Sequence, residues 1–154
     1  MLKVRELMTH DVLTVAPNVS VREAAELLSS EGVGGTPVVL RGNIVGMVSA
    51  RDLLDFIASL PSDPAEVDGG TEHGILDDHT VEEAMTRGPL CTIAPDDAAT
   101  KAATLMKEEG VHRLPVVEGT KLVGIISTLD LVRALADGKL SRRTFVFPSR
   151  GSLV

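Results

Sequence analysis

The chain has 154 residues, which suits one domain or two small ones that share a core. Hydrophobic residues make up 44% and charged residues 24%, so the composition supplies a core and excludes disorder of the whole chain. Three Phe with no Tyr and no Trp disfavour nucleic-acid modules that stack bases on aromatic rings, and the net charge of −7 opposes binding to a phosphate backbone.

The negative charge is concentrated in one stretch. Ten Asp and Glu and no Lys or Arg lie between residues 52 and 86. All 15 Lys and Arg therefore lie in the rest of the chain, which can accept an anionic ligand.

A lone cysteine, Cys91, excludes an internal disulfide and a cysteine-based zinc cluster. We expect it to be buried and unreactive in a strand. No apolar run is long enough to span a membrane, and residues 1–6 have no signal-peptide character, so we expect a cytoplasmic protein. His73 and His79 flank two acidic residues, but without metal-ligand spacing, so no metal site is predicted.

The chain contains an internal repeat. A shift of 78 residues places residues 14–53 on residues 92–131 with 17 identities in 40 positions. Upstream, Met8-Thr9 matches Met85-Thr86 at a shift of 77. Two copies are too few for a solenoid, and we expect a pseudo-twofold pair that shares a core.

The first copy opens with a short segment, residues 4–8, followed by an extended segment at residues 13–15. The sequence Ser-Val-Arg-Glu at 20–23 is a capping box that predicts a helix to Glu31, and Gly32 fits its left-handed stop. Strands are predicted at residues 37–40 and 44–48, around an Arg-Gly-Asn turn, and a second helix begins at Ser49.

The second copy predicts the same elements. They are a leading segment at 81–85, an extended segment at 91–93, a helix from Asp97 to Glu109 stopped by Gly110, strands at 114–117 and 122–126, and a helix from Ser127. The fold class is therefore α/β. Two β-α-β-β-α repeats are expected to be related by a pseudo-twofold axis and packed through their small sheets.

The domain boundaries follow from this repeat. Residues 1–58 form the first repeat and residues 81–136 the second. Residues 59–80, rich in Pro, Gly and acid, are predicted to be a solvated linker. Residues 137–154 form a basic tail whose Phe145-Val146-Phe147 segment either adds a strand to a partner or folds back on its own module.

The ordered motifs resemble the cystathionine-β-synthase (CBS) domain pair, or Bateman module. In the first half they are Val-Arg-Glu-Leu-Met-Thr (4–9), Thr-Val-Ala-Pro (14–17) and Val-Gly-Met-Val-Ser-Ala-Arg-Asp-Leu (45–53). Their counterparts include Gly-Val-His-Arg-Leu-Pro-Val-Val (110–117) and Val-Gly-Ile-Ile-Ser-Thr-Leu-Asp-Leu (123–131). The resemblance implies a stand-alone CBS protein. Such modules bind AMP, ADP, ATP or S-adenosylmethionine in clefts between the repeats and form head-to-head or head-to-tail dimers.

The resemblance implies that Asp52 and Asp130 bind the ribose hydroxyls, for which a carboxylate has two suitably spaced oxygens. A phosphate is expected at the starts of the same two helices, where free amides and the positive end of the helix dipole are available, and the candidate residues are Ser49, Arg51, Ser127 and Thr128. A simpler interpretation is that each Ser-x-x-Asp caps its helix. The two roles are compatible.

His112-Arg113 looks like the phosphate-contacting pair in the gamma subunit of AMP-activated protein kinase. The family's crosswise arrangement implies that this pair serves the Asp52 cleft, whereas the Asp130 cleft faces residues 33–35, which carry no cation. We therefore expect the Asp52 cleft to prefer a phosphorylated nucleotide. The alternative is a surface pair that packs on the acidic linker.

Adenine is expected to lie between aliphatic side chains and backbone, which suits a chain without Tyr or Trp. The candidate residues, each of which could instead be ordinary core, are Met8, Thr9, Val12, Val33, Gly34, Met47, Met85, Thr86, Val111 and Ile125.

We therefore expect a non-catalytic regulatory module, such as an energy sensor, with no obligatory cofactor. It would act as a homodimer on an unknown protein partner, without nucleic acid or membrane. No nucleophile triad or pair of acids occurs at a recognisable spacing, so an enzyme is not predicted. The alternative is a structural or interaction module with no physiological ligand.

Overall fold

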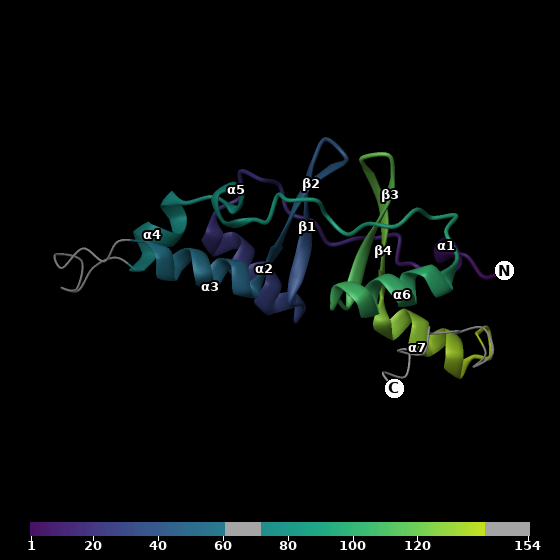
Figure 1. Cartoon of the computed structure of the whole chain (residues 1–154). Helices are drawn as coiled ribbons and strands as arrows, with labels where there is room; N and C mark the ends of the chain where they lie inside the picture. Colours follow the sequence, from purple (N-terminus) through teal and green to yellow (C-terminus); the bar gives the residue numbers. More distant parts are fainter. Residues whose placement is uncertain (61–71, 141–154) are drawn as a thin grey trace, which may run out of the picture. The chain divides into compact units, whose positions relative to one another are not determined.

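The computed structural model describes residues 1–60 and 72–140, which are drawn in colour in Figure 1. The chain divides into two compact units. The first-repeat unit consists of residues 13–90, and the second-repeat unit combines residues 1–12 with the chain from Cys91 onward. The compact units therefore differ from the sequence repeats, because the leading segments have changed places.

The two units contain the same core elements. The first-repeat unit holds α2 (Val21–Glu31), β1 (Gly35–Leu40), β2 (Asn43–Ser49), α3 (Ala50–Ser59), α4 (Glu72–Asp78) and α5 (Val81–Ala84). The second-repeat unit holds α1 (Val4–Leu7), α6 (Ala99–Glu109), β3 (Arg113–Glu118), β4 (Lys121–Ser127) and α7 (Thr128–Ala136).

Helix α2 has the predicted ends. Ser20 accepts a hydrogen bond from the Glu23 amide at 3.1 Å, and Gly32 adopts the left-handed conformation with φ 63°. These caps satisfy amide and carbonyl groups that the helix leaves without intrahelical partners. Val21, Ala24 and Leu28 form its buried face.

Helix α6 begins two residues later than predicted. Ala98 stands where α2 has Ser20 and gives no side-chain cap. Asp97 instead lies in the preceding turn, where its carboxylate accepts from the Ala94 amide at 3.0 Å and pairs with Lys101 at 3.0 Å. The acidic residue therefore orders the approach to the helix rather than opening it.

The predicted strands form two antiparallel hairpins, each a few residues longer than expected. Gly35 pairs with Ser49 at the open end of β1–β2, and Arg113 pairs with Ser127 at the open end of β3–β4. Arg41 at φ 52° takes the left-handed conformation in the first hairpin turn.

The extended segment before each helix forms only a single parallel bridge. In the first-repeat unit Val15 donates to the Pro37 carbonyl at 3.1 Å and accepts from the Val39 amide at 2.9 Å. Ile93 makes the same pair of bonds in the second-repeat unit. Pro17 and Pro95 follow two residues later and cannot donate, so neither contact continues as a ladder.

Each leading segment packs in the unit of the other repeat. In the second-repeat unit Val4 donates to the Asp97 carbonyl at 2.9 Å, and Thr9 bridges Ile125. In the first-repeat unit Val81 donates to Val19 at 2.8 Å. Val4 and Val81 are fully buried, so the exchanged segments contribute to the cores.

The linker is more ordered than predicted, because residues 72–78 form α4. Asp77 accepts from Arg22 on α2 at 2.9 Å, and Leu76 packs against the first-repeat core. A helix this short depends on such tertiary contacts. Residues 61–71 lie outside the described residues.

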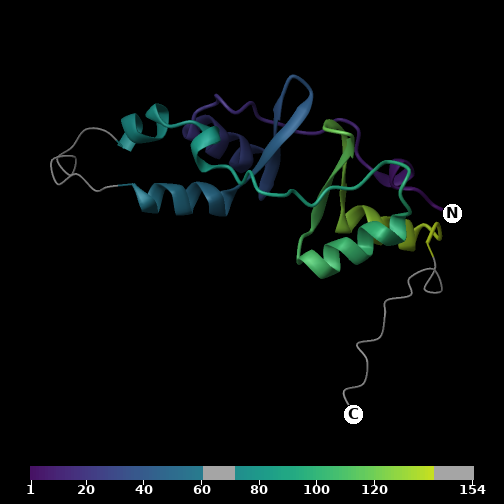
Figure 2. The ribbon, with the colours of Figure 1, turned by 45° about the horizontal axis from the view of Figure 1, so that its top comes forward.

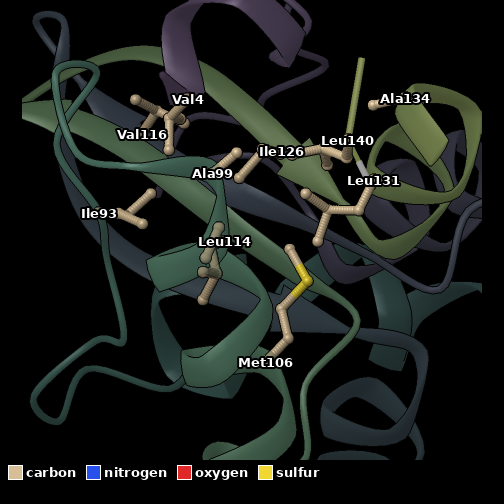
Figure 3. Packing of buried hydrophobic residues seen from close by; sticks show 11 residues of the cluster. Val4, Ile93, Ala99, Met106, Leu114, Val116, Ile126, Leu131, Ala134 and Leu140 are labelled. Atoms are coloured by element: carbon tan, nitrogen blue, oxygen red, sulfur yellow. The ribbon is translucent and has the colours of Figure 1, made fainter. Parts of the chain in front are cut away.

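The second-repeat core fills the space between α6, α7 and the β3–β4 hairpin, as Figure 3 shows. Its members from these elements include Met106, Leu114, Val116, Ile126 and Leu131. The first-repeat core is built from Val15, Val21, Ala24, Leu28, Val38, Val48, Leu53 and Val81. These cores set where the starts of α3 and α7 lie.

The described chain ends at Leu140, which is buried against the second-repeat core and donates to the Ala134 carbonyl at 3.1 Å. The predicted Phe-Val-Phe segment lies beyond it, outside the described residues. None of the helices in the described ranges is both long enough and apolar enough to cross a bilayer.

Candidate functional site

The start of α3 holds Asp52 in a capping box. Ser49 is the N-cap, and its hydroxyl accepts from the Asp52 amide at 3.1 Å. In return Asp52 Oδ2 accepts from the Ser49 amide at 2.8 Å. The predicted capping interpretation is therefore confirmed. One carboxylate oxygen is held by the cap, which leaves Oδ1 for a second interaction.

That second oxygen meets the exchanged leading segment. Thr86 Oγ1 donates to Asp52 Oδ1 at 3.3 Å. Thr86 and Met47 exchange backbone hydrogen bonds of 2.8 and 3.0 Å, which fixes the threonine beside β2. Met47, Asp52 and Thr86 are therefore brought together within the first-repeat unit.

The start of α7 repeats the arrangement around Asp130. Ser127 accepts from the Asp130 amide at 3.2 Å, and Asp130 Oδ2 accepts from both the amide and the hydroxyl of Ser127, at 2.8 and 3.0 Å. The Asp130 side chain is 13% exposed, and its Oδ1 lies 4.0 Å from the Arg133 guanidinium. This carboxylate therefore already has a cation one turn along its helix.

Arg133 was not among the predicted site residues, although its spacing of three from Asp130 was the available signal. The equivalent residue after Asp52 is Asp55, which pairs with Arg51 at 3.7 Å on the exposed side of α3. The residue three positions after the candidate carboxylate is therefore acidic in the first-repeat unit and basic in the second-repeat unit.

His112 and Thr128 lie together in the second-repeat unit, since the Thr128 amide donates to the His112 carbonyl at 2.9 Å. Arg113 begins β3 opposite Ser127 and is exposed. The first-repeat unit has the same backbone contact between Ala50 and Gly34, at 2.9 Å, without a cation. His112, Arg113 and Asp52 belong to different units, so their crosswise pairing stays a prediction.

The aliphatic candidates separate into two sets. Met47, Met85, Thr86, Val33 and Gly34 belong to the first-repeat unit, and Met8, Thr9, Val12, Val111 and Ile125 to the second. Several also pack against the cores, as the simpler interpretation predicted: Val33 and Met85 in the first-repeat unit, and Met8 and Val111 in the second.

Two glycines that the sequence analysis did not single out allow the leading segments to reach the hairpins. A Cβ at Gly124 would lie 2.6 Å from Met8 Sδ and 3.0 Å from the Thr9 carbonyl oxygen. A Cβ at Gly46 would lie 2.8 Å from both Met85 Sδ and the Thr86 carbonyl oxygen. The available sequence signal for this close approach was that both repeats contain a Val-Gly pair in the second strand and a Met-Thr pair in the leading region.

Cys91 is half-buried and lies outside the strands, contrary to the predicted strand position. Burial raises the pKa of its thiol, which keeps it protonated near neutral pH. Among the described residues no group of three or more His, Cys, Asp or Glu could hold a metal ion.

The family model for the CBS domain matches residues 4–59 and 81–137. The chain belongs to the CBS domain family. The CBS domain-containing protein YhcV of Bacillus subtilis (strain 168) is 34% identical over 131 residues, with 85% of this chain and 84% of that protein covered. Other curated relatives are longer: the match covers only 15% of the A-adding tRNA nucleotidyltransferase of Aquifex aeolicus (strain VF5).

Solved CBS structures have the same fold. CBSX2 in complex with AMP is 31% identical, with a TM-score of 0.72 and coverage of 91% of this chain and 100% of that chain. The CBS domain pair of MJ0100, in complex with 5′-methylthioadenosine and S-adenosyl-L-methionine, is 25% identical, with a TM-score of 0.68 and coverage of 91% and 99%. A putative acetoin utilization protein (AcuB) from Vibrio cholerae is 25% identical, with a TM-score of 0.74 and coverage of 90% and 93%.

Proposed function

We propose that this CBS pair is a non-catalytic regulatory module that binds an adenosine compound, with Asp52 and Asp130 accepting hydrogen bonds from ribose hydroxyls. One observation carries the proposal: both units hold a carboxylate at the third position of a helix by the same capping box. The hydrogen bond that the Ser amide donates to the Asp carboxylate fixes this carboxylate before a ligand arrives, which lowers the cost of ordering it.

The ligand class is supported by relatives. CBSX2 was solved with AMP, and the MJ0100 pair was solved with two adenosine compounds that carry sulfur. AMP, ADP, ATP and S-adenosylmethionine are accordingly the candidates for this chain. An adenine nucleotide would make the module an energy sensor that acts on a cytoplasmic protein partner.

The phosphate contacts are proposed from charge and position. His112 and Arg113 are exposed beside the start of α7, where Thr128 adds a hydroxyl and the helix adds amide donors. Ser127 contributes less than predicted, because its hydroxyl already bonds Asp130. Ser49 and Arg51 are the weaker candidates, since the serine is used in the cap and the arginine lies beside Asp55.

A thermal-shift panel tests the ligand class. AMP, ADP, ATP and S-adenosylmethionine are added to wild type, Asp52→Asn and Asp130→Asn, with the exposed Asp78→Asn and Asp137→Asn as matched controls. Asparagine can keep the cap bond while losing the charge. A ligand at 100 times its Kd stabilises by about 2.7 kcal/mol. A shift in wild type and controls that shrinks in the site variants supports the proposal. No shift with any compound favours the interaction module without a ligand.

We also propose that the module is a homodimer. Leu54 and Ile57 on α3 are 68% and 38% exposed, and their repeat equivalents Val132 and Leu135 on α7 are 56% and 42% exposed. Aliphatic residues exposed at matching positions in both repeats are typical of a surface that a partner covers. Light scattering of the eluting protein should give the mass of two chains, and a single-chain mass would contradict it.

A further inference from the structure

The two leading segments, residues 4–8 and 81–85, dock on their units through the same backbone hydrogen bonds. Figure 2 shows α1 (purple) beside α6 and α5 (teal) beside α2. In each unit two successive amides of the leading segment donate to carbonyls of the turn before the long helix, so the backbone does not distinguish one segment from the other. The bonds run from Val4 to Asp97 and from Arg5 to Pro95 at 2.9 Å each, and from Val81 to Val19 and from Glu82 to Pro17 at 2.8 and 2.9 Å.

Side-chain size, in contrast, differs between the two docking surfaces. Helix α3 carries Phe56 at the position where α7 carries Ala134, which is buried in the second-repeat core. The leading helix that contacts α3 carries the small Ala84, which packs against the first-repeat core as Phe56 does. The leading helix that contacts α7 carries Leu7, which packs against the second-repeat core. A large side chain therefore accompanies a small one in both units.

The Phe56 ring has a further partner just before the second leading segment. It lies 5.3 Å from the His79 ring, with an edge-to-face geometry. Such ring pairs contribute beyond the area that they bury. The residue equivalent to His79 is Leu2, which packs against the second-repeat core instead. The ring contact therefore favours the second leading segment on the first-repeat unit.

Charge also differs between the two docking surfaces. Asp96, in the turn before α6, pairs with Lys3 at 3.3 Å and with Arg5 at 2.9 Å. The equivalent turn residue of the first-repeat unit is the neutral Asn18, and the residue equivalent to Arg5 is Glu82. Docking of the second leading segment on the second-repeat unit would bring Glu82 toward Asp96, and like charges repel. Exposed ion pairs contribute little to stability, so charge adds to the effect of size.

We infer that side-chain size and charge select the crossed docking, in which each leading segment joins the unit of the other repeat. Uncrossed docking would press Leu7 against Phe56 in the first-repeat unit. It would leave unfilled space between Ala84 and Ala134 in the second-repeat unit. Overpacking and cavities both destabilise a core.

This selection also reaches the candidate site. Thr86 directly follows the second leading segment and donates to Asp52 at 3.3 Å. In uncrossed docking that place would fall to Thr9, the equivalent residue after the first leading segment. The selected docking therefore determines which segment orients the carboxylate. The inference is independent of the proposed ligand.

A double-mutant cycle between positions 7 and 134 tests the selection by size. Ala134→Phe overpacks the second-repeat unit and Leu7→Ala leaves a cavity there, so each should raise the unfolding equilibrium constant, measured with urea, about fivefold or more. The double variant reproduces the pairing of the first-repeat unit. Its constant should therefore lie at least about tenfold below the product of the two single effects.

Leu7→Ala with Phe56→Ala is the control cycle. Its two effects should multiply to within about twofold, because crossed docking places these side chains in different units. Independent effects at positions 7 and 134, or coupling of about tenfold between positions 7 and 56, overturn the inference. If Ala134→Phe does not fold, Ala134→Val with Leu7→Ala gives a milder form of the same cycle.

Engineered disulfides report which unit the first leading segment joins. Lys3 and Ala98 lie opposite one another in an antiparallel bridge, at a spacing that suits a disulfide. The residue equivalent to Ala98 in the first-repeat unit is Ser20. In a Cys91→Ala background, Lys3→Cys/Ala98→Cys should form an intrachain disulfide, detected by mass spectrometry, and Lys3→Cys/Ser20→Cys should not.

Exchange of the selecting residues should change this result. The segment exchange should lower the yield of the 3–98 disulfide at least about threefold, and further exchange of the docking surfaces should restore it. An unchanged 3–98 yield after the segment exchange, or no recovery after the second exchange, overturns the inference. The segment exchange combines Arg5→Glu, Leu7→Ala, Glu82→Arg and Ala84→Leu, and the surface exchange adds Asn18→Asp, Phe56→Ala, Asp96→Asn and Ala134→Phe.

Discussion

Thr86 donates a hydrogen bond to Asp52, at 3.3 Å, across 34 residues of sequence. The threonine directly follows the leading segment of the second repeat, residues 81–85, yet the carboxylate that it orients belongs to the first repeat. Together with the cap bond from the Ser49 amide, it holds both oxygens of Asp52. The exchange of leading segments therefore bears directly on the candidate site.

Thr86→Val should weaken adenosine binding at the Asp52 site by about 2- to 13-fold, because a net hydrogen bond contributes about 0.5–1.5 kcal/mol. The melting temperature should change little, since the bond is exposed. Titration calorimetry measures the affinity. Thr104→Val, which removes a threonine hydroxyl that donates to the Thr100 carbonyl within α6, is the matched control for the Asp52 site. Equal affinities of Thr86→Val and wild type for that site would exclude a positioning role for Thr86.

Gly46→Ala and Gly124→Ala should each lower the free energy of unfolding by about 1–3 kcal/mol, the usual cost of overpacking. The added methyl group would meet the backbone oxygen of Thr86 or Thr9 as well as a methionine sulfur. Urea unfolding followed by circular dichroism gives the values. Gly88→Ala is the control, since a Cβ there meets nothing within 4 Å. If Gly46→Ala and Gly124→Ala were both as stable as wild type, close docking of the leading segments would be refuted.

Ser127→Ala should lower the free energy of unfolding by about 1 kcal/mol, because it removes the N-cap of α7. The same loss is expected for Ser49→Ala at α3. Ser29→Ala, at an exposed position inside α2, should be neutral or slightly stabilising because alanine has the higher helix propensity. Chemical denaturation compares the three variants. Equal stability of the cap variants and the control would argue against the capping boxes.

Asp97 should make the second-repeat unit less stable in acid. Hydrogen bonds from the Ala94 amide and then from Lys101 lower the pKa of its carboxyl. A lowered folded-state pKa contributes stability above the ordinary value of about 3.9, and this is lost as the pH falls through the folded pKa. The stability difference between wild type and Asp97→Asn should therefore be present at pH 7 and shrink below about pH 4. A difference that is constant with pH would contradict this, and the exposed Asp137→Asn corrects for general charge effects.

The repeat made most of the fold predictable. Capping residues and an αL glycine placed both ends of α2 and the start of α3 within a residue of those observed, because their signals act within one helical turn. The late start of α6 followed from a local competition, in which Asp97 caps a turn instead of the helix. Helix α4 was missed because its stability comes from Leu76 and Asp77 contacting α2 and the core, which a composition rich in acid and glycine does not reveal.

The candidate site was predictable only in part, for the same reason. Asp52 and Asp130 were predicted to be site residues from the resemblance to the CBS pair, whereas their capping role followed from the local Ser-x-x-Asp motif, which occurs twice. The contact of Thr86 with Asp52 depends on which hairpin each leading segment joins, and no local pattern carries that information. Periodicity likewise does not distinguish the aliphatic residues that pack in the cores from those available to a purine.

The most direct test of the proposed function is titration calorimetry of AMP into wild type and the double variant Asp52→Asn/Asp130→Asn, alongside the control Asp78→Asn/Asp137→Asn. Each charged hydrogen bond is worth about 1.5–3 kcal/mol, so the double site variant should bind at least about tenfold more weakly than wild type. The control should match wild type. AMP binding of equal strength in all three proteins would contradict the assignment of the ribose carboxylates.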